Sequence, residues 1–114
     1  IIVLKNGKNV YPQEIEFLIN KIPYVIESLV YPREKSKTDT MLCAKIVYDK
    51  EHIKEYLGEK TEQEYKQIIW EEIKKINQTL PIFKHIKSIT ITTQGLKKTT
   101  TQKVKRYEEL KELI

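Results

Sequence analysis

The amino-acid sequence predicts an α+β fold, in which a small N-terminal β-hairpin is followed by a three-stranded sheet flanked by helices. Short runs rich in β-branched and aromatic residues alternate with segments whose apolar residues recur at helical spacing. The length of 114 residues suits one compact core and is too short for two comfortable domains. We therefore expect residues 1–114 to form a single domain.

The chain is expected to open with a hairpin around residues 6–7, because the pair Asn-Gly between two short apolar runs favours a two-residue type I′ turn. A helix should follow from Pro12, since proline suits the first helical turn. Apolar residues within 15–19 give this helix one apolar face, and we expect it to end near Lys21.

Three longer segments read as strands of the main sheet. Residues 24–31 and 41–48 are rich in β-branched and aromatic residues, and the polar stretch 32–39 suits a loop between them. Residues 85–93 alternate apolar and polar side chains, which predicts a third strand. A loop from Gln94 to about 101 should follow it.

Helical patterns occupy the rest of the chain. A short helix is expected around residues 52–57, and Thr61 with Glu64 forms a capping box at the start of a longer helix. Apolar residues within 104–114 fit a final short amphipathic helix, which would place Lys103 at the junction of loop and helix.

The composition describes an ordinary globular protein with a formal net charge of +5 that comes almost entirely from lysine. Only Arg33 and Arg106 could make the bidentate contacts by which arginine recognises guanine. The single Cys43 excludes an internal disulfide and favours a reducing, cytoplasmic setting. No apolar run approaches a membrane span, and the absence of an initiating methionine leads us to expect further sequence upstream.

Conventional catalytic constellations are missing from the sequence. His52 and His85 lack metal-ligand spacing, so we predict no metal site, and there is no glycine-rich phosphate loop. The acidic pairs at 71–72 and 108–109 lie among lysines on expected helix faces, where they are most simply solvated charges.

Two segments, 5–16 (KNGKNVYPQEIE) and 97–106 (KKTTTQKVKR), are not explained by packing alone. The first resembles the glycine-containing motif of the AMP-forming acyl- and aryl-CoA ligases, the adenylate-forming superfamily. Its matching residues are Gly7, Val10, Pro12, Glu14, Ile15 and Glu16. The second resembles the closing motif of the same superfamily, Pro-Lys-Thr-x-x-Gly-Lys-Ile-x-Arg. Its matching residues are Lys98, Thr99, Lys103, Val104 and Arg106.

This resemblance covers essentially the whole chain. It implies the C-terminal lid domain of an ATP-dependent, AMP-forming ligase, of the long-chain fatty acid–CoA ligase type, whose large AMP-binding domain lies upstream in the same chain. ATP and Mg²⁺ would be bound mainly by that upstream domain, and a carboxylic acid and coenzyme A would be the other substrates. The isolated lid domain should have no turnover.

The resemblance also implies roles for individual residues. Lys103 would be the catalytic lysine that contacts the acyl carboxylate and the phosphates during adenylation, and the loop before it would be a segment that can be withdrawn. The loop residues that would support it are Thr99, Thr100, Thr101 and Gln102. In the thioester-forming pose a second loop would approach coenzyme A, and its residues are Lys5, Asn6, Gly7, Lys8 and Asn9.

One departure from the motif concerns Gln102, which stands where the superfamily usually has glycine. If that glycine has a positive φ, either glutamine bears the backbone cost or the loop takes another shape. Elsewhere simpler interpretations stand beside the functional ones. Turn geometry alone can explain Gly7, the N-terminus of a helix can explain Glu14 and Glu16, and the lysines around Lys103 can form a solvated basic face.

Two other functions compete with the ligase interpretation. A small basic nucleic-acid-binding module would use residues 97–106 as a phosphate-contacting strip and would bind with steep salt dependence. The segment has no stacking aromatic residues and little arginine, so we predict no nucleic-acid partner. The other alternative is a free-standing interaction domain that has lost ligase function.

Overall fold

The computed structural model describes residues 1–113 and confirms the α+β class. Its strands are β1 (Ile2–Val3), β2 (Asn9–Val10), β3 (Val25–Ser36), β4 (Asp39–Tyr48) and β5 (Ile86–Thr92). Its helices are α1 (Pro12–Ile19), α2 (Lys50–Leu57), α3 (Glu62–Asn77), the 3₁₀ helix η1 (Ile82–Lys84) and α4 (Arg106–Leu113). Ile114, the last expected position of the final helix, lies outside the described residues.

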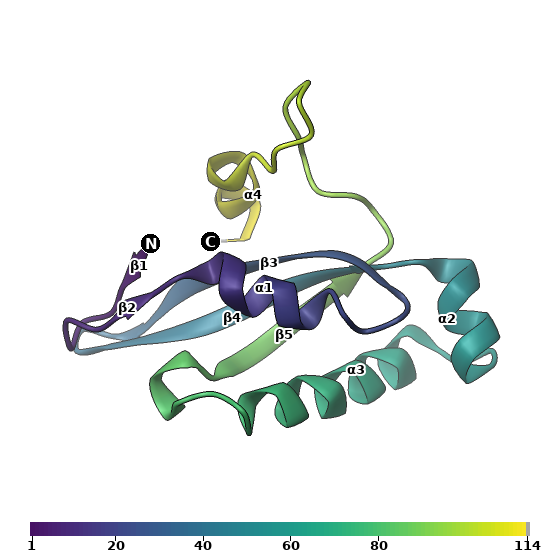
Figure 1. Cartoon of the computed structure of the whole chain (residues 1–114), viewed down its shortest axis with the longest axis horizontal. Coiled ribbons are helices and arrows are strands. Elements are labelled where there is room, and N and C mark those ends of the chain that lie inside the picture. Colours follow the sequence, from purple (N-terminus) through teal and green to yellow (C-terminus); the bar gives the residue numbers. More distant parts are fainter. Residues whose placement is uncertain (114) are drawn as a thin grey trace.

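The strands form two sheets, as expected. Strands β1 and β2 make an antiparallel pair, and the larger sheet has the order β3-β4-β5. Strand β4 pairs antiparallel with β3 and parallel with β5. Because parallel strands need a long crossover connection, α2 and α3 together carry the chain back to the start of β5 (Figure 1).

Two boundaries differ from the sequence-based predictions. The polar stretch 32–39, predicted as a loop, continues both strands, with Arg33 opposite Met41 and Glu34 opposite Thr40. Pairing across this ribbon satisfies the backbone while the charged side chains stay in water, so polarity did not mark a loop. Helix α4 begins at Arg106 rather than at 104, because residue 104 pairs with residue 98 across a hairpin.

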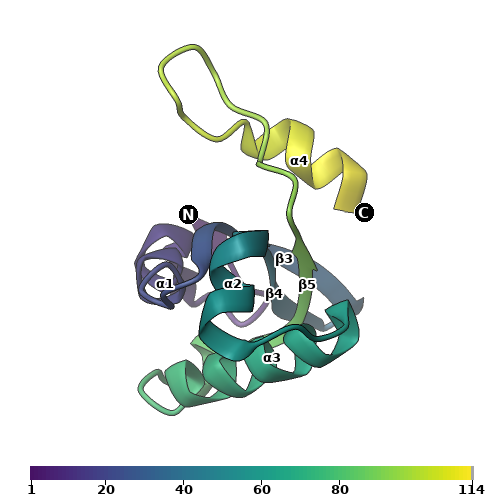
Figure 2. The ribbon, with the colours of Figure 1, turned by 90° about the vertical axis from the view of Figure 1, so that its right-hand side faces the viewer.

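The larger sheet is covered on both faces, because alternate side chains of a strand point to opposite sides (Figure 2). One face packs against α1, α2 and α3, and its buried residues include Val30, Ala44, Ile46, Ile86, Ile15, Ile19, Ile53, Ile69 and Ile73. The other face packs against the segment leading into α4 and α4 itself, and its residues are Leu29, Tyr31, Cys43, Val47, Leu96, Met41, Val104, Leu110 and Leu113.

Side chains at both ends of α3 make hydrogen bonds to backbone groups, at the N-terminus to the helix itself and at the C-terminus to β5. The predicted capping box is confirmed, with Glu64 N donating to Thr61 Oγ1 at 3.2 Å and Thr61 N donating to Glu64 Oε1 at 3.0 Å. At the other end the buried Asn77 amide both donates to Ile86 O and accepts from Ile86 N, each at 2.9 Å. Asn77 thus fixes where β5 begins relative to α3.

Candidate functional site

The N-terminal hairpin turns through a three-residue loop. Leu4 N donates to Lys8 O at 2.9 Å and Gly7 N donates to Leu4 O at 2.9 Å. Gly7 has φ +86°, whereas Asn6 does not have a positive φ, so the predicted two-residue type I′ turn is wrong. A Cβ at Gly7 would meet no atom within 4 Å, so the backbone conformation and not crowding favours glycine there.

The segment before α4 forms a second hairpin with the same turn. Thr99 N donates to Lys103 O at 2.8 Å and Gln102 N donates to Thr99 O at 2.9 Å. Gln102 has φ +66° and is the only non-glycine residue within 1–113 with a positive φ. Of the two alternatives left by the sequence, glutamine therefore keeps the left-handed backbone and bears its cost. Lys103 follows this residue directly, as Lys8 follows Gly7.

The tip of the second hairpin projects away from the sheet (Figures 1 and 2). Thr99 Oγ1 accepts a hydrogen bond from Lys103 N at 3.2 Å and lies 3.0 Å from Thr101 Oγ1, so two of the threonines order the turn. Thr100, Gln102 and Lys103 are exposed. Lys103 takes part in none of the ion pairs that form among residues 1–113, which leaves its ammonium group available to a ligand.

Glu16 joins the two motif segments at the base of this hairpin. Arg106 Nη1 and Nη2 donate to its two carboxylate oxygens at 2.8 and 2.6 Å, and Val30 N donates to Oε2 at 2.8 Å. The hydrogen bond to Glu16 raises the pKa of Arg106, although burial acts in the opposite direction. Glu16 is thus a buried partner of the closing motif, in addition to being a residue of α1.

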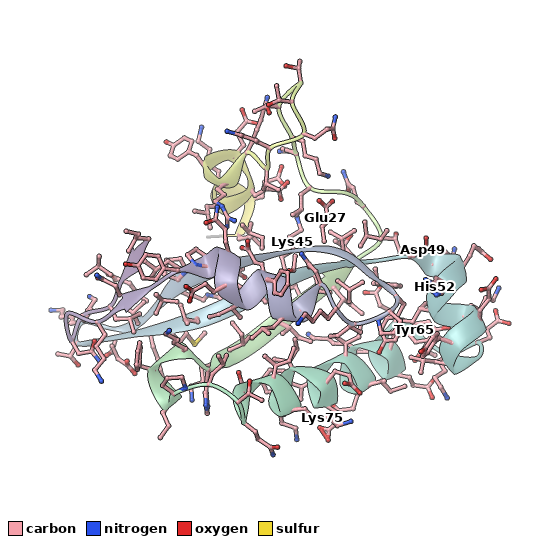
Figure 3. All side chains as sticks on the ribbon, viewed as in Figure 1. Glu27, Lys45, Asp49, His52, Tyr65 and Lys75 are labelled. Carbon is pink, nitrogen blue, oxygen red and sulfur yellow. The ribbon has the colours of Figure 1, made fainter. Side chains whose placement is uncertain are left out.

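Glu27, on β3, binds residues 96–98, which form the limb of the hairpin that leads away from the sheet. Its Oε2 accepts from Leu96 N at 2.9 Å and from Lys98 Nζ at 2.8 Å, and Lys98 Nζ also donates to Leu96 O at 3.2 Å. Figure 3 shows Glu27 on the side of the sheet that faces the hairpin.

Glu109, on α4, grips the same limb. Its carboxylate accepts from Lys97 N at 2.6 Å and from Lys45 Nζ at 2.9 Å, and the residue is only 2% exposed. Burial by itself would raise the pKa of Glu109, but the hydrogen bonds from Lys97 N and Lys45 and the charges of both lysines bring it below its usual range. The prediction that Glu109 is a solvated charge is wrong, whereas Glu108 is exposed.

The basic run 97–106 is not a uniform solvated face. Lys97 pairs with Glu112, while Lys98 and Arg106 pair with glutamates of β3 and α1. These internal pairs neutralise three of the five cations in the segment, which removes the continuous phosphate-contacting strip that a nucleic-acid interface would need.

A basic cleft of about 530 Å³ lies beside the first hairpin. Its lining comes from that hairpin, the β3–β4 turn, η1 and β5, and includes Lys5, Asn6, Lys8, Lys35, Phe83, His85 and Lys87. Lys8 Nζ lies 4.6 Å from the centre of the Phe83 ring, and Lys5 Nζ lies 3.1 Å from Glu34. Several lysines and an aromatic ring in one concave surface suit a phosphorylated ligand.

Two further properties concern the described part of the chain. Within residues 1–113 no cluster of three or more histidine, cysteine, aspartate or glutamate side chains could hold a metal ion. No helix of this part combines the length and the apolar character needed to cross a membrane.

Comparison with known families identifies the family to which this domain belongs. Residues 1–113 match the family described as AMP-binding enzyme C-terminal domain. The chain belongs to this family. It is therefore a C-terminal domain of the adenylate-forming acyl-CoA synthetase superfamily, as the two motifs predicted. A comparison with curated proteins finds no match.

Solved structures of this superfamily share the fold of the AMP-binding C-terminal domain. An ATP-bound RpMatB-BxBclM chimera superposes with a TM-score of 0.71 at 23% identity, covering 99% of this chain and 20% of that one. MatB from Rhodopseudomonas palustris has a TM-score of 0.68 at 26% identity, covering 98% and 19%. A Mycobacterium tuberculosis fatty acyl CoA synthetase has 0.67 at 24%, covering 97% and 19%. The chain thus spans about a fifth of the proteins it matches.

The left-handed backbone at residue 102 can be tested against its counterpart at residue 7. Gln102→Gly should raise the free energy of unfolding by about 1 kcal/mol, because glycine lacks the Cβ that disfavours a positive φ. Gly7→Gln should lower it by a similar amount in the same type of turn. Urea unfolding of the domain measures both, and a loss of stability in both variants would contradict the assignment.

The depressed pKa of Glu109 predicts a pH dependence of stability. The ionised carboxylate contributes fully above the unfolded pKa of about 4.3, and its contribution is lost as pH falls through the lower folded value. Glu109→Gln should therefore lower the free energy of unfolding most near neutral pH, and the difference from the parent domain should shrink below about pH 4. The exposed neighbour provides a control, since Glu108→Gln should change little at any pH. An unchanged difference between neutral pH and pH 3 would count against this account.

Proposed function

We propose that residues 1–114 form the C-terminal lid domain of an ATP-dependent, AMP-forming ligase that joins a carboxylic acid, of the fatty acid class, to coenzyme A. The observation that carries this proposal is the pair of matched hairpins. Each motif segment contains one, and each hairpin places a lysine, Lys8 or Lys103, directly after its left-handed residue. The two motifs are those of the superfamily as a whole, so the fatty acid class rests only on the overall resemblance of the chain to ligases of the long-chain fatty acid–CoA type.

Lys103 supplies the cation for the first half-reaction. The carboxylate oxygen of the acid attacks the α-phosphate of ATP, a new oxygen–phosphorus bond forms, and pyrophosphate leaves with the electrons of the broken bond. Negative charge develops between the two reactants. Lys103, which is exposed and forms no ion pair within residues 1–113, stabilises this charge when the tip enters the upstream active site. ATP and Mg²⁺ are bound mainly by the upstream AMP-binding domain of the same chain.

The two hairpins serve successive poses of the domain. Their tips lie at different sides of the molecule, so one fixed placement against a single active site presents only one of them (Figure 1). Rotation of the domain between half-reactions brings each in turn. In the second half-reaction the sulfur of coenzyme A attacks the acyl carbonyl and AMP leaves. The loop at residues 5–9 approaches coenzyme A in that pose, and the cleft beside it receives its phosphates.

Two further expectations concern the activity of the isolated domain and its cellular setting. The domain by itself has no turnover, because the acyl pocket and most nucleotide contacts belong to the upstream domain. The cytoplasmic setting stays a prediction from the single cysteine, and Cys43 is free and buried.

Lys103→Ala in the full-length ligase tests the first role. Carboxylate-dependent pyrophosphate release should fall by roughly 100-fold or more, the usual loss when one fixed charge is removed from a transition state. Thioester formation from a pre-made acyl-adenylate should be retained. Lys105→Ala is the matched control, because this exposed lysine lies on the same segment and outside the hairpin tip. Normal pyrophosphate release by Lys103→Ala would refute the assignment.

Substitutions in the basic cleft should affect the second half-reaction and spare the first. The double substitution Lys8→Gln and Lys87→Gln should raise the KM for coenzyme A by about 10-fold and weaken its dependence on salt, because two phosphate-facing charges are lost. Adenylation should stay near the parent rate. Lys50→Gln with Lys75→Gln, on the exposed faces of α2 and α3, controls for net charge. Equal effects of the two pairs would exclude the cleft as the coenzyme A site.

A further inference from the structure

The hairpin that carries Lys103 has an exposed tip, and its base is bound by three carboxylates from three separate elements. Each carboxylate accepts one backbone N–H and at least one cationic side chain. The three residues are Glu16 on α1, Glu27 on β3 and Glu109 on α4. We call this arrangement the carboxylate clamp. Glu16 belongs to a motif segment, whereas Glu27 and Glu109 lie outside both.

Glu27 and Glu109 hold two consecutive peptide groups of the limb that leaves the sheet. Leu96 N donates to Glu27 at 2.9 Å and Lys97 N donates to Glu109 at 2.6 Å. Successive N–H groups of an extended chain point to opposite sides. Carboxylates that bind two of them in sequence therefore fix both the position of the limb and its rotation about its own axis.

The cations of the clamp tie the same limb to the sheet. Lys98 pairs with Glu27 at 2.8 Å, and Lys45 of β4 pairs with Glu109 at 2.9 Å. Figure 3 shows Glu27 and Lys45 on the side of the sheet that faces the hairpin. Burying charges is costly unless each is paired, and every member of this group is paired. The apolar contacts of Leu110 and Leu113 already attach α4 to the sheet, so attachment alone does not require these charges.

We propose that Glu27 and Glu109 are positioning residues for Lys103, which set the direction in which the hairpin leaves the sheet. The inference rests on the proposed role of Lys103 in adenylation. The lysine then travels with the rotating domain as part of a rigid body, and the loop that carries it does not open or fold back on its own. A small change of direction at the base is enlarged at the tip, and a misplacement of about 1 Å can cost about 100-fold in rate.

The test uses the full-length ligase and measures the two half-reactions separately. Glu27→Gln and Glu109→Gln keep the shape of the side chain and an acceptor oxygen but remove the charge that binds the lysine. Each should lower kcat for carboxylate-dependent pyrophosphate release by about 10- to 100-fold. Thioester formation from a pre-made acyl-adenylate should stay within about 2-fold of the parent rate, because the first hairpin is untouched. Glu108→Gln, on the exposed face of α4, should leave both half-reactions at the parent rate.

A double-substitution cycle separates positioning from general support. In a Lys103→Ala background, Glu27→Gln should cause no further loss of pyrophosphate release, because a residue that acts through Lys103 has nothing left to act on. A merely structural role would lower both half-reactions, and its loss would persist in that background, which would overturn the proposal. If Glu109→Gln fails to fold, Lys45→Gln replaces it, because Lys45 is the cation that Glu109 binds and its side chain is more exposed, at 18% against 2%. Its removal should give the same selective loss.

The outcomes also distinguish this inference from the function on which it rests. Normal pyrophosphate release by Lys103→Ala refutes the adenylation role, and the positioning role with it. Loss of release in Lys103→Ala, together with parent rates in both glutamate variants and in Lys45→Gln, refutes the positioning role alone.

Discussion

The ion pair between Glu16 and Arg106 is the interaction that ties α4, and the hairpin before it, to α1 and β3. It joins two segments 90 positions apart in sequence, and the same carboxylate also accepts the Val30 N–H. Glu16 therefore touches α1, β3 and α4 together. Because the carboxylate is buried, it is stable there only while both donors are present. Helix α4 and the hairpin before it take their place on the sheet through this contact and its two companions at Glu27 and Glu109.

The two hairpins of the motif segments adopt the same left-handed backbone conformation with different residues. Both use a three-residue loop that ends in a left-handed residue, glycine at position 7 and glutamine at position 102. A non-glycine residue keeps such a conformation only where the surrounding structure determines it more than once. At the second hairpin, the pairing of residues 98 and 104 and the carboxylate clamp hold the backbone of residue 102 in this conformation. The catalytic assignment of Lys103 thus relies on contacts some distance from the lysine itself.

The sheet is covered by side chains on both faces. Its two faces carry separate apolar clusters, so the strands form a stiff layer between the helices. The first hairpin lies at one end of the sheet and the second rises above it, so the two tips are at different places on the domain (Figures 1 and 2). A rigid domain with two differently placed tips can change the chemistry of an active site by rotating as a whole.

Local sequence signals by themselves determined much of this protein. The capping box at Thr61 and the helical spacing of the apolar residues in α3 depend on residues within a few positions of one another, and both were predicted without a structure. The same holds for the presence of a turn at Gly7, although not for its type. Only the tertiary structure decided that the polar stretch 32–39 continues two strands, and that Glu16 and Glu109 are buried. The partners that settle these points, such as Arg106 for Glu16 and Lys45 for Glu109, lie 90 and 64 positions away. Burial and charge pairing at such separations arise from the packing of the chain, and periodicity within a short window carries no information about them.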